Sequence, residues 1–161
     1  MEPFLAWLEG SALGHAIRSS GLWTYAILNL THILGISSLF GAILVLDLRL
    51  LGIWRSVPMV ALVRPVLPIA TAGFVLAVLS GICMLATNGT EYIGNPLLVV
   101  KFTAIGAGLI NVAVVNRLPV WRSRNAGSLS TAGERQLAVV GAVSLLCWVT
   151  AITAGRMIAY W

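Results

Sequence analysis

Residues 22–48 read LWTYAILNLTHILGISSLFGAILVLDL, an apolar run with few polar side chains. A helix of about 20 predominantly apolar residues is long enough to cross the roughly 30 Å hydrocarbon core of a bilayer. Three similar runs follow, at residues 66–86, 96–115 and 137–160. The sequence therefore predicts an all-α fold, an integral membrane four-helix bundle in which residues 1–161 form a single transmembrane domain.

The composition agrees with this fold class. Hydrophobic residues make up 59% of the chain and charged residues 9%, which lies well outside the balance of soluble globular proteins. The net charge of +5 is spread over short connections between apolar runs, so it does not indicate nucleic-acid binding. We expect the lipid bilayer to be the main partner. No nucleophile–base pair, phosphate loop, paired carboxylate or HExxH motif is present, so the sequence assigns no enzyme class.

The first residues form a separate segment. Residues 3–20 place Phe4, Leu5, Leu8, Leu13 and Ile17 at helical spacing, which predicts an amphipathic helix lying on the membrane surface. The segment lacks a basic start and carries acidic residues, so we interpret it as retained and not as a cleaved signal peptide.

The basic residues predict the orientation. Seven of the ten Lys and Arg residues flank the first and third connections: Arg49, Arg55, Arg64, Arg117, Arg122, Arg124 and Arg135. The positive-inside rule then places these connections in the cytoplasm and both termini outside. Aromatic residues agree with this orientation, with Trp54 and Trp121 expected at the inner interface and Trp23, Tyr25, Tyr92, Tyr160 and Trp161 at the outer one.

Small residues and prolines predict how the second span packs. Gly73, Ala77 and Gly81 are spaced by one helical turn, and such stripes let membrane helices approach closely. We therefore expect leucine at Gly81 to cost more stability than leucine at Gly94, in a loop. Pro65 and Pro68 are expected to open the span, where a missing amide donor costs little.

Ionisable residues inside the spans are the candidates for function, because they are costly in hydrocarbon. His32 precedes Arg49 by 17 residues and Lys101 precedes Arg117 by 16, so both lie about 24–26 Å from the inner arginines. Arg156 is expected slightly further out. Asp47 is most simply read as a helix-end ion pair with Arg49.

His32 shares one helix face with Tyr25 and Asn29, and we expect this polar stripe to face the bundle. A structural reading has His32 hydrogen-bonded to a neighbouring helix while Lys101 and Arg156 reach the head groups. A functional reading makes His32 an axial ligand of haem b, with the two cations holding the propionates. Copper is the alternative metal, with His32, Met84, Met157 and Cys83 as nitrogen and sulfur ligands.

Several segments together resemble an uncharacterised family of small bacterial inner-membrane proteins over nearly the whole chain: residues 31–35, 46–52, 95–96 and 155–160, with Lys101, Asn111 and Arg117. More distantly, the chain is similar to the copper-resistance D type domain. Its general four-helix arrangement is also similar to that of HemJ-type membrane proteins, which bind haem b through a histidine of the first helix. The resemblance implies a bacterial inner membrane and functional positions at His32, Lys101 and Arg156. In such a membrane the outside termini given by the positive-inside rule would be periplasmic.

Two functions from different classes therefore stay open. The first is a membrane protein that binds haem b or copper in the outer half of the bilayer for redox chemistry or metal handling. The second is a ligand-free accessory or assembly subunit, whose partners would be copies of itself or the other subunits of a membrane complex.

Overall fold

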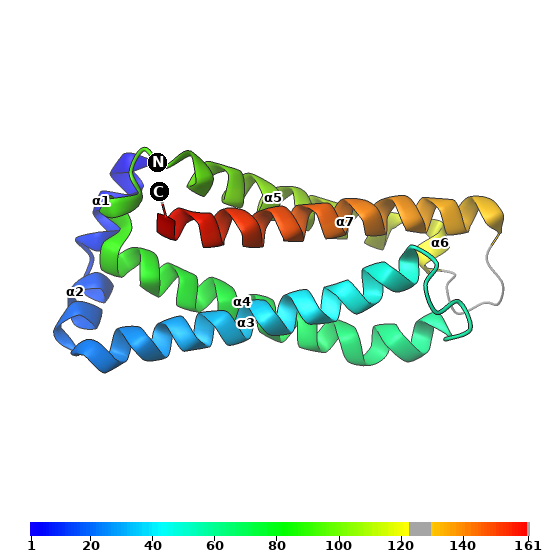
Figure 1. Ribbon diagram of the computed structural model, residues 1–161, viewed down its shortest axis with the longest axis horizontal. Coiled ribbons are helices and arrows are strands. Elements are labelled where there is room, and N and C mark those ends of the chain that lie inside the picture. The colour runs from blue at the N-terminus through cyan, green and yellow to red at the C-terminus, as the bar shows by residue number, and fades with distance from the viewer. Residues whose placement is uncertain (123–129, 161) are drawn as a thin grey trace. The chain divides into compact units, whose positions relative to one another are not determined.

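The computed structural model describes residues 1–122 and 130–160, and every regular element in these ranges is helical (Figure 1). The four long helices are α3 (Leu22–Leu50), α4 (Met59–Asn88), α5 (Pro96–Arg117) and α7 (Thr131–Met157). Each is long and apolar enough to cross a membrane. The all-α prediction is confirmed, and the protein is a multi-pass membrane protein with four candidate spans. Arg124 and Trp161, used above for the orientation, lie outside the described residues.

The second span begins earlier than predicted. Helix α4 starts at Met59, so Pro65 and Pro68 lie inside the helix and do not open it. A proline removes one intrahelical hydrogen bond and normally ends or kinks a helix. Here the first turns of α4 bury Met59 and Val63 in an apolar core, and this packing outweighs the local preference.

Short helices complete the chain. Helices α1 (Glu2–Glu9) and α2 (Ala12–Ser19) replace the single amphipathic helix predicted for residues 3–20. The break falls at Ser11, whose hydroxyl accepts the Gly14 N–H and caps α2. The others are η1 (Gly89–Tyr92), α6 (Pro119–Arg122) and η2 (Ile158–Tyr160).

The chain divides into two compact units, and each is described by itself. Unit 1 comprises Met1–Leu39 and Ile69–Asn95, and unit 2 comprises Phe40–Pro68 and Pro96–Trp161. Helices α3 and α4 therefore each contribute one part to each unit. The single transmembrane domain stays a prediction.

Unit 1 is built on direct contact between the backbones of α3 and α4. A Cβ atom on Gly35 would lie 2.7 Å from the backbone nitrogen of Ala77. A Cβ on Gly73 would lie 2.5 Å from the backbone nitrogen of Leu39. No larger residue fits at either glycine without moving a helix. The small-residue stripe of α4 thus packs as predicted.

The helices of unit 2 are held together by packed apolar side chains. Its apolar core draws residues from α3, α4, α6 and α7: Leu46, Leu50, Met59, Val63, Val66, Trp121, Leu137 and Val140. Helix α5 lies alongside α7 (Figure 1). Trp121 is 5% exposed, so it is a core residue and not the interfacial anchor predicted, because α6 places its ring in the core. Trp54, the other predicted inner anchor, is 51% exposed.

Candidate functional site

The predicted polar stripe lies on the inner side of α3 in unit 1. Tyr25, Asn29 and His32 are half-buried. Ile33 and Leu34, on other faces of the same helix, are more than half exposed, as expected for lipid-facing residues. The prediction that the stripe faces the interior of the fold is confirmed within this unit.

The His32 imidazole is held by a serine of α4. Its Nδ1 lies 3.0 Å from Oγ of Ser80, which is buried. The same hydroxyl donates its hydrogen to the backbone carbonyl of Leu76 at 2.5 Å. A serine hydroxyl has one hydrogen to give, so Ser80 Oγ must accept from His32. Nδ1 therefore carries a proton, and in the neutral form of the ring Nε2 carries the lone pair.

A glycine of α4 fixes the ring from a second direction. A Cβ atom on Gly81 would lie 3.1 Å from Cε1 and 3.6 Å from Nδ1 of His32. The imidazole is thus set against the α4 backbone beside its hydrogen-bond partner. Metal-binding histidines commonly have this arrangement, in which the second ring nitrogen donates to a fixed acceptor.

The two candidate cations belong to unit 2. The Lys101 stem on α5 lies against α7, since a Cβ on Gly155 would be 3.4 Å from Lys101 Cε. Arg156 follows Gly155 directly, and its Nη2 donates to the Tyr160 hydroxyl at 2.5 Å. Its guanidinium carbon lies 4.9 Å from the centre of the Tyr160 ring. Lys101 and Arg156 thus share one end of the α5–α7 pair, whereas His32 belongs to unit 1.

The sulfur ligands considered for copper are scattered. Cys83 and Met84 are half-buried in unit 1, and Met157 is 48% exposed in unit 2. Within residues 1–122 and 130–160, no three His, Cys, Asp or Glu side chains gather as metal ligands usually do. A copper site would therefore depend on His32 and thioether sulfur.

An arginine joins the N-terminal helices to the end of α4. Arg18 Nη1 donates to the backbone carbonyls of Ala86 and Thr87, each at 3.1 Å, and Nη2 donates to the carbonyl of Glu9 at 2.9 Å. Such carbonyls near a helix C-terminus lack intrahelical partners, and a cation is favoured there. Leu5 is buried beside Gly89 of η1.

A second contact comes from the Glu9 carboxylate, which accepts the Thr90 backbone N–H at 2.7 Å. This hydrogen bond lowers the pKa of Glu9 below its ordinary value. The N-terminal helices thus pack on the α4–η1 end of unit 1, and their location on the membrane surface stays a prediction. His15 lies on α2, with Nδ1 3.5 Å from Arg18 Nη2.

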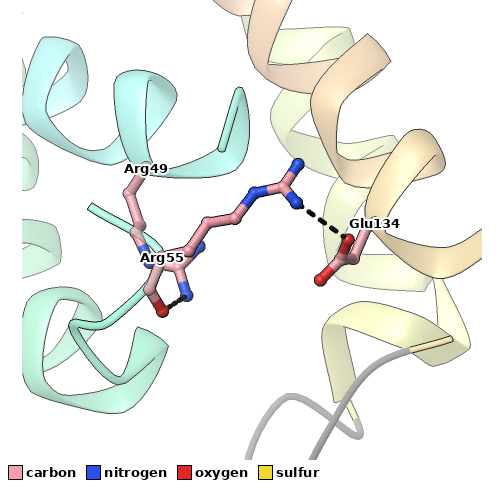
Figure 2. Close-up of polar contacts among 3 residues, drawn as sticks. All are labelled: Arg49, Arg55 and Glu134. Carbon is pink, nitrogen blue, oxygen red and sulfur yellow. Dashed lines mark hydrogen bonds and ion pairs between the residues drawn. The ribbon is translucent and has the colours of Figure 1, made fainter. Parts of the chain in front are cut away.

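The predicted ion pair between Asp47 and Arg49 is wrong. Figure 2 shows Arg49 turned to the backbone carbonyl of Arg55 instead. Arg49 donates to the backbone carbonyls of Val57 and Arg55, at 2.9 and 3.2 Å. Residues two apart on a helix do not face each other, so Arg49 turns away from Asp47. Arg55 Nη1 instead lies 3.7 Å from Oε2 of Glu134, which brings the first connection close to the start of α7 in unit 2.

Sequence reasoning missed Ser80. It lies seven residues after Gly73 and three after Ala77, so it belongs to the face of α4 that packs on α3. A polar residue on a small-residue packing stripe is the signal that would have found it.

A family model matches residues 4–161, and its description is a family of unknown function, DUF6644. No curated protein and no solved structure matches the chain significantly.

Proposed function

Because the chain belongs to DUF6644, a family of unknown function, we propose its function from the geometry around His32. His32 would hold the iron of haem b through Nε2, in a membrane protein that serves redox chemistry or metal handling. Copper is the alternative metal on the same nitrogen.

One observation carries the proposal, namely the hydrogen-bond chain from His32 through Ser80 to the Leu76 carbonyl. It selects the tautomer that a metal requires, because iron and copper bind the unprotonated ring nitrogen. It also orients the ring and makes Nε2 a better electron donor.

Other polar residues would complete the ligand environment. Tyr25 and Asn29 share the inner face of α3 with His32. Lys101 and Arg156 belong to unit 2, and their role as partners of the propionates stays a prediction from the sequence. Haem b would supply one-electron redox chemistry. The part of unit 1 would be to hold the imidazole in a fixed orientation against α4.

The second candidate, a ligand-free accessory or assembly subunit, rests on the same contacts. Ser80 and Gly81 would equally accommodate a histidine whose only role is to join α3 to α4. In that case, exposed apolar faces would meet lipid, copies of the chain or the subunits of a larger complex.

The absorption spectrum separates the two candidates. Protein purified from haem-supplemented, copper-replete cells should show a Soret band. His32→Ala should abolish this band while circular dichroism stays helical. His15→Ala is the matched control, since His15 is the second histidine of the chain, and it should keep the band. Wild-type protein with neither a Soret band nor stoichiometric copper would leave the accessory-subunit function.

We also propose that the chain lies in a bacterial inner membrane with both termini periplasmic. The excess of basic residues around the first and third connections supports this orientation. In a background without Cys83 and Cys147, a membrane-impermeant thiol reagent added from the periplasm should label Thr90→Cys. Labelling of Ser56→Cys instead would show that the chain has the opposite orientation.

A further inference from the structure

A carboxyl group is buried in the apolar interior of unit 2. Asp47 is 3% exposed, and its neighbours on α3, Leu46 and Leu50, belong to the apolar core. Helix α7 covers it closely, since a Cβ on Gly141 would lie 3.3 Å from the Asp47 carbonyl oxygen. The protein itself excludes water from this side chain.

Few hydrogen bonds reach this carboxyl. The Ser144 hydroxyl on α7 is bonded to it. Its Oδ2 is buried and has no hydrogen-bond partner among the residues that the structure describes. An ionised carboxylate has lone pairs for about four hydrogen bonds, and burying it with so few partners is very costly.

The neighbouring charged groups do not neutralise it. Arg49, on the same helix, is turned to the carbonyls of the first connection, and Glu134 of α7 pairs with Arg55. Asn111 of α5 is uncharged and donates to the Val140 carbonyl at 3.0 Å. In residues 1–122 and 130–160, Asp47 therefore takes part in no ion pair.

We propose that Asp47 is a proton-binding site inside unit 2, with the proton on Oδ2 and the Ser144 hydroxyl bonded to the other oxygen. Asp47 precedes the end of α3 by three residues, about 4.5 Å along the helix axis, so the proton would exchange with water at that end. Hydronium gives its proton to the carboxylate, leaving water and the neutral acid, and no electron moves. The ligand is the proton itself, and the site does not depend on a haem.

Infrared spectroscopy of the full-length protein in lipid nanodiscs tests this directly. A protonated carboxyl gives a C=O stretching band that is separate from carboxylate and amide bands and shifts in D2O. We expect this band at neutral pH, its loss in Asp47→Asn and its retention in Glu134→Gln, which removes an exposed carboxylate of the same unit. A spectrum in which Asp47→Asn removes a carboxylate band instead would overturn the proposal.

A second variant covers the case in which Asp47→Asn fails to fold. Ser144→Ala removes the hydroxyl bonded to the carboxyl, so the band of the neutral acid should move to higher frequency. A protonated-carboxyl band that Ser144→Ala leaves in place would contradict the proposal.

Discussion

The two units hold their helices together in different ways. In unit 1, α3 and α4 meet at Gly35 and Gly73, where backbone touches backbone. In unit 2, an apolar core of larger side chains separates the helices, with Leu137 among its most buried members. Lipid tails are as apolar as leucine, so helices in a membrane associate largely through close packing. Unit 1 should therefore be most sensitive to added atoms, and unit 2 to removed atoms.

The largest effect is expected from Gly73→Leu in unit 1. A side chain there meets the backbone of Leu39 and the Gly35 carbonyl oxygen, at 2.5 and 2.8 Å, and neither can give way alone. We expect a loss of about 3 kcal/mol or more, seen as a lower midpoint of thermal unfolding in detergent. Gly41→Leu is the control, because a Cβ on Gly41 meets nothing within 4 Å. Equal losses of stability in both variants would show that backbone contact between α3 and α4 does not hold unit 1 together.

Leu137→Ala should produce the next largest effect, in unit 2. Leu137 is 2% exposed, and truncating a buried leucine typically costs about 2–5 kcal/mol. Leu146→Ala on the same helix is matched in chemistry but 68% exposed, so its unfolding midpoint should stay near that of the wild type. If both alanines cost the same, unit 2 is not held by its side-chain core.

A smaller effect should appear at the edge of unit 1 in acid. The Thr90 N–H donates to the Glu9 carboxylate, and this holds the pKa of Glu9 below its ordinary 4.5. The contact therefore stabilises the N-terminal helices at pH above about 4.5 and is lost as the pH falls through the lowered pKa. The protection factor of the Thr90 amide, which is its intrinsic exchange rate divided by the observed rate at the same pH, should fall over that range. In Glu9→Gln this fall should be absent, and its persistence would point to another group.

The smallest effect is expected for Glu134→Gln in unit 2. The Arg55–Glu134 pair is 3.7 Å long, with side chains 67% and 47% exposed (Figure 2). Such exposed pairs contribute about 0.5 kcal/mol, and salt screens them. The unfolding midpoint should barely change. A drop as large as that of Leu137→Ala would mean that this ion pair, and not the apolar core, holds unit 2.

The four long helices and the small-residue packing of α4 could be predicted from the sequence. Both depend on residues close together in the chain, namely the length of an apolar run and the spacing of small residues by one helical turn. It did not predict contacts between distant residues. Ser80 and His32 lie 48 positions apart, and only the packing of α3 on α4 pairs them. Asp47 was paired with the nearby Arg49, whereas its observed partner is Ser144 of α7.

Two predictions about prolines and glycines of the chain are also corrected by the structure. Pro65 and Pro68 were read as a helix start, but burial of the preceding turn extends α4 past them. Gly94 lies in a loop, where the sequence predicts that leucine is tolerated, yet its φ of +82° favours glycine and would strain a leucine. Gly41 is the better reference for substitutions on the long helices.

The tautomer of His32 is the most direct test of the site. The chain has two histidines, so ¹⁵N labelling of histidine in the purified protein gives one ring pair for His15 and one for His32. We expect His32 to show a protonated Nδ1 and an unprotonated Nε2, with the Nε2 resonance shifted or lost when haem is added. Ser80→Ala should release the tautomer preference. A wild-type His32 with a protonated Nε2 and a bare Nδ1 would contradict both the hydrogen-bond chain and the ligand role built on it.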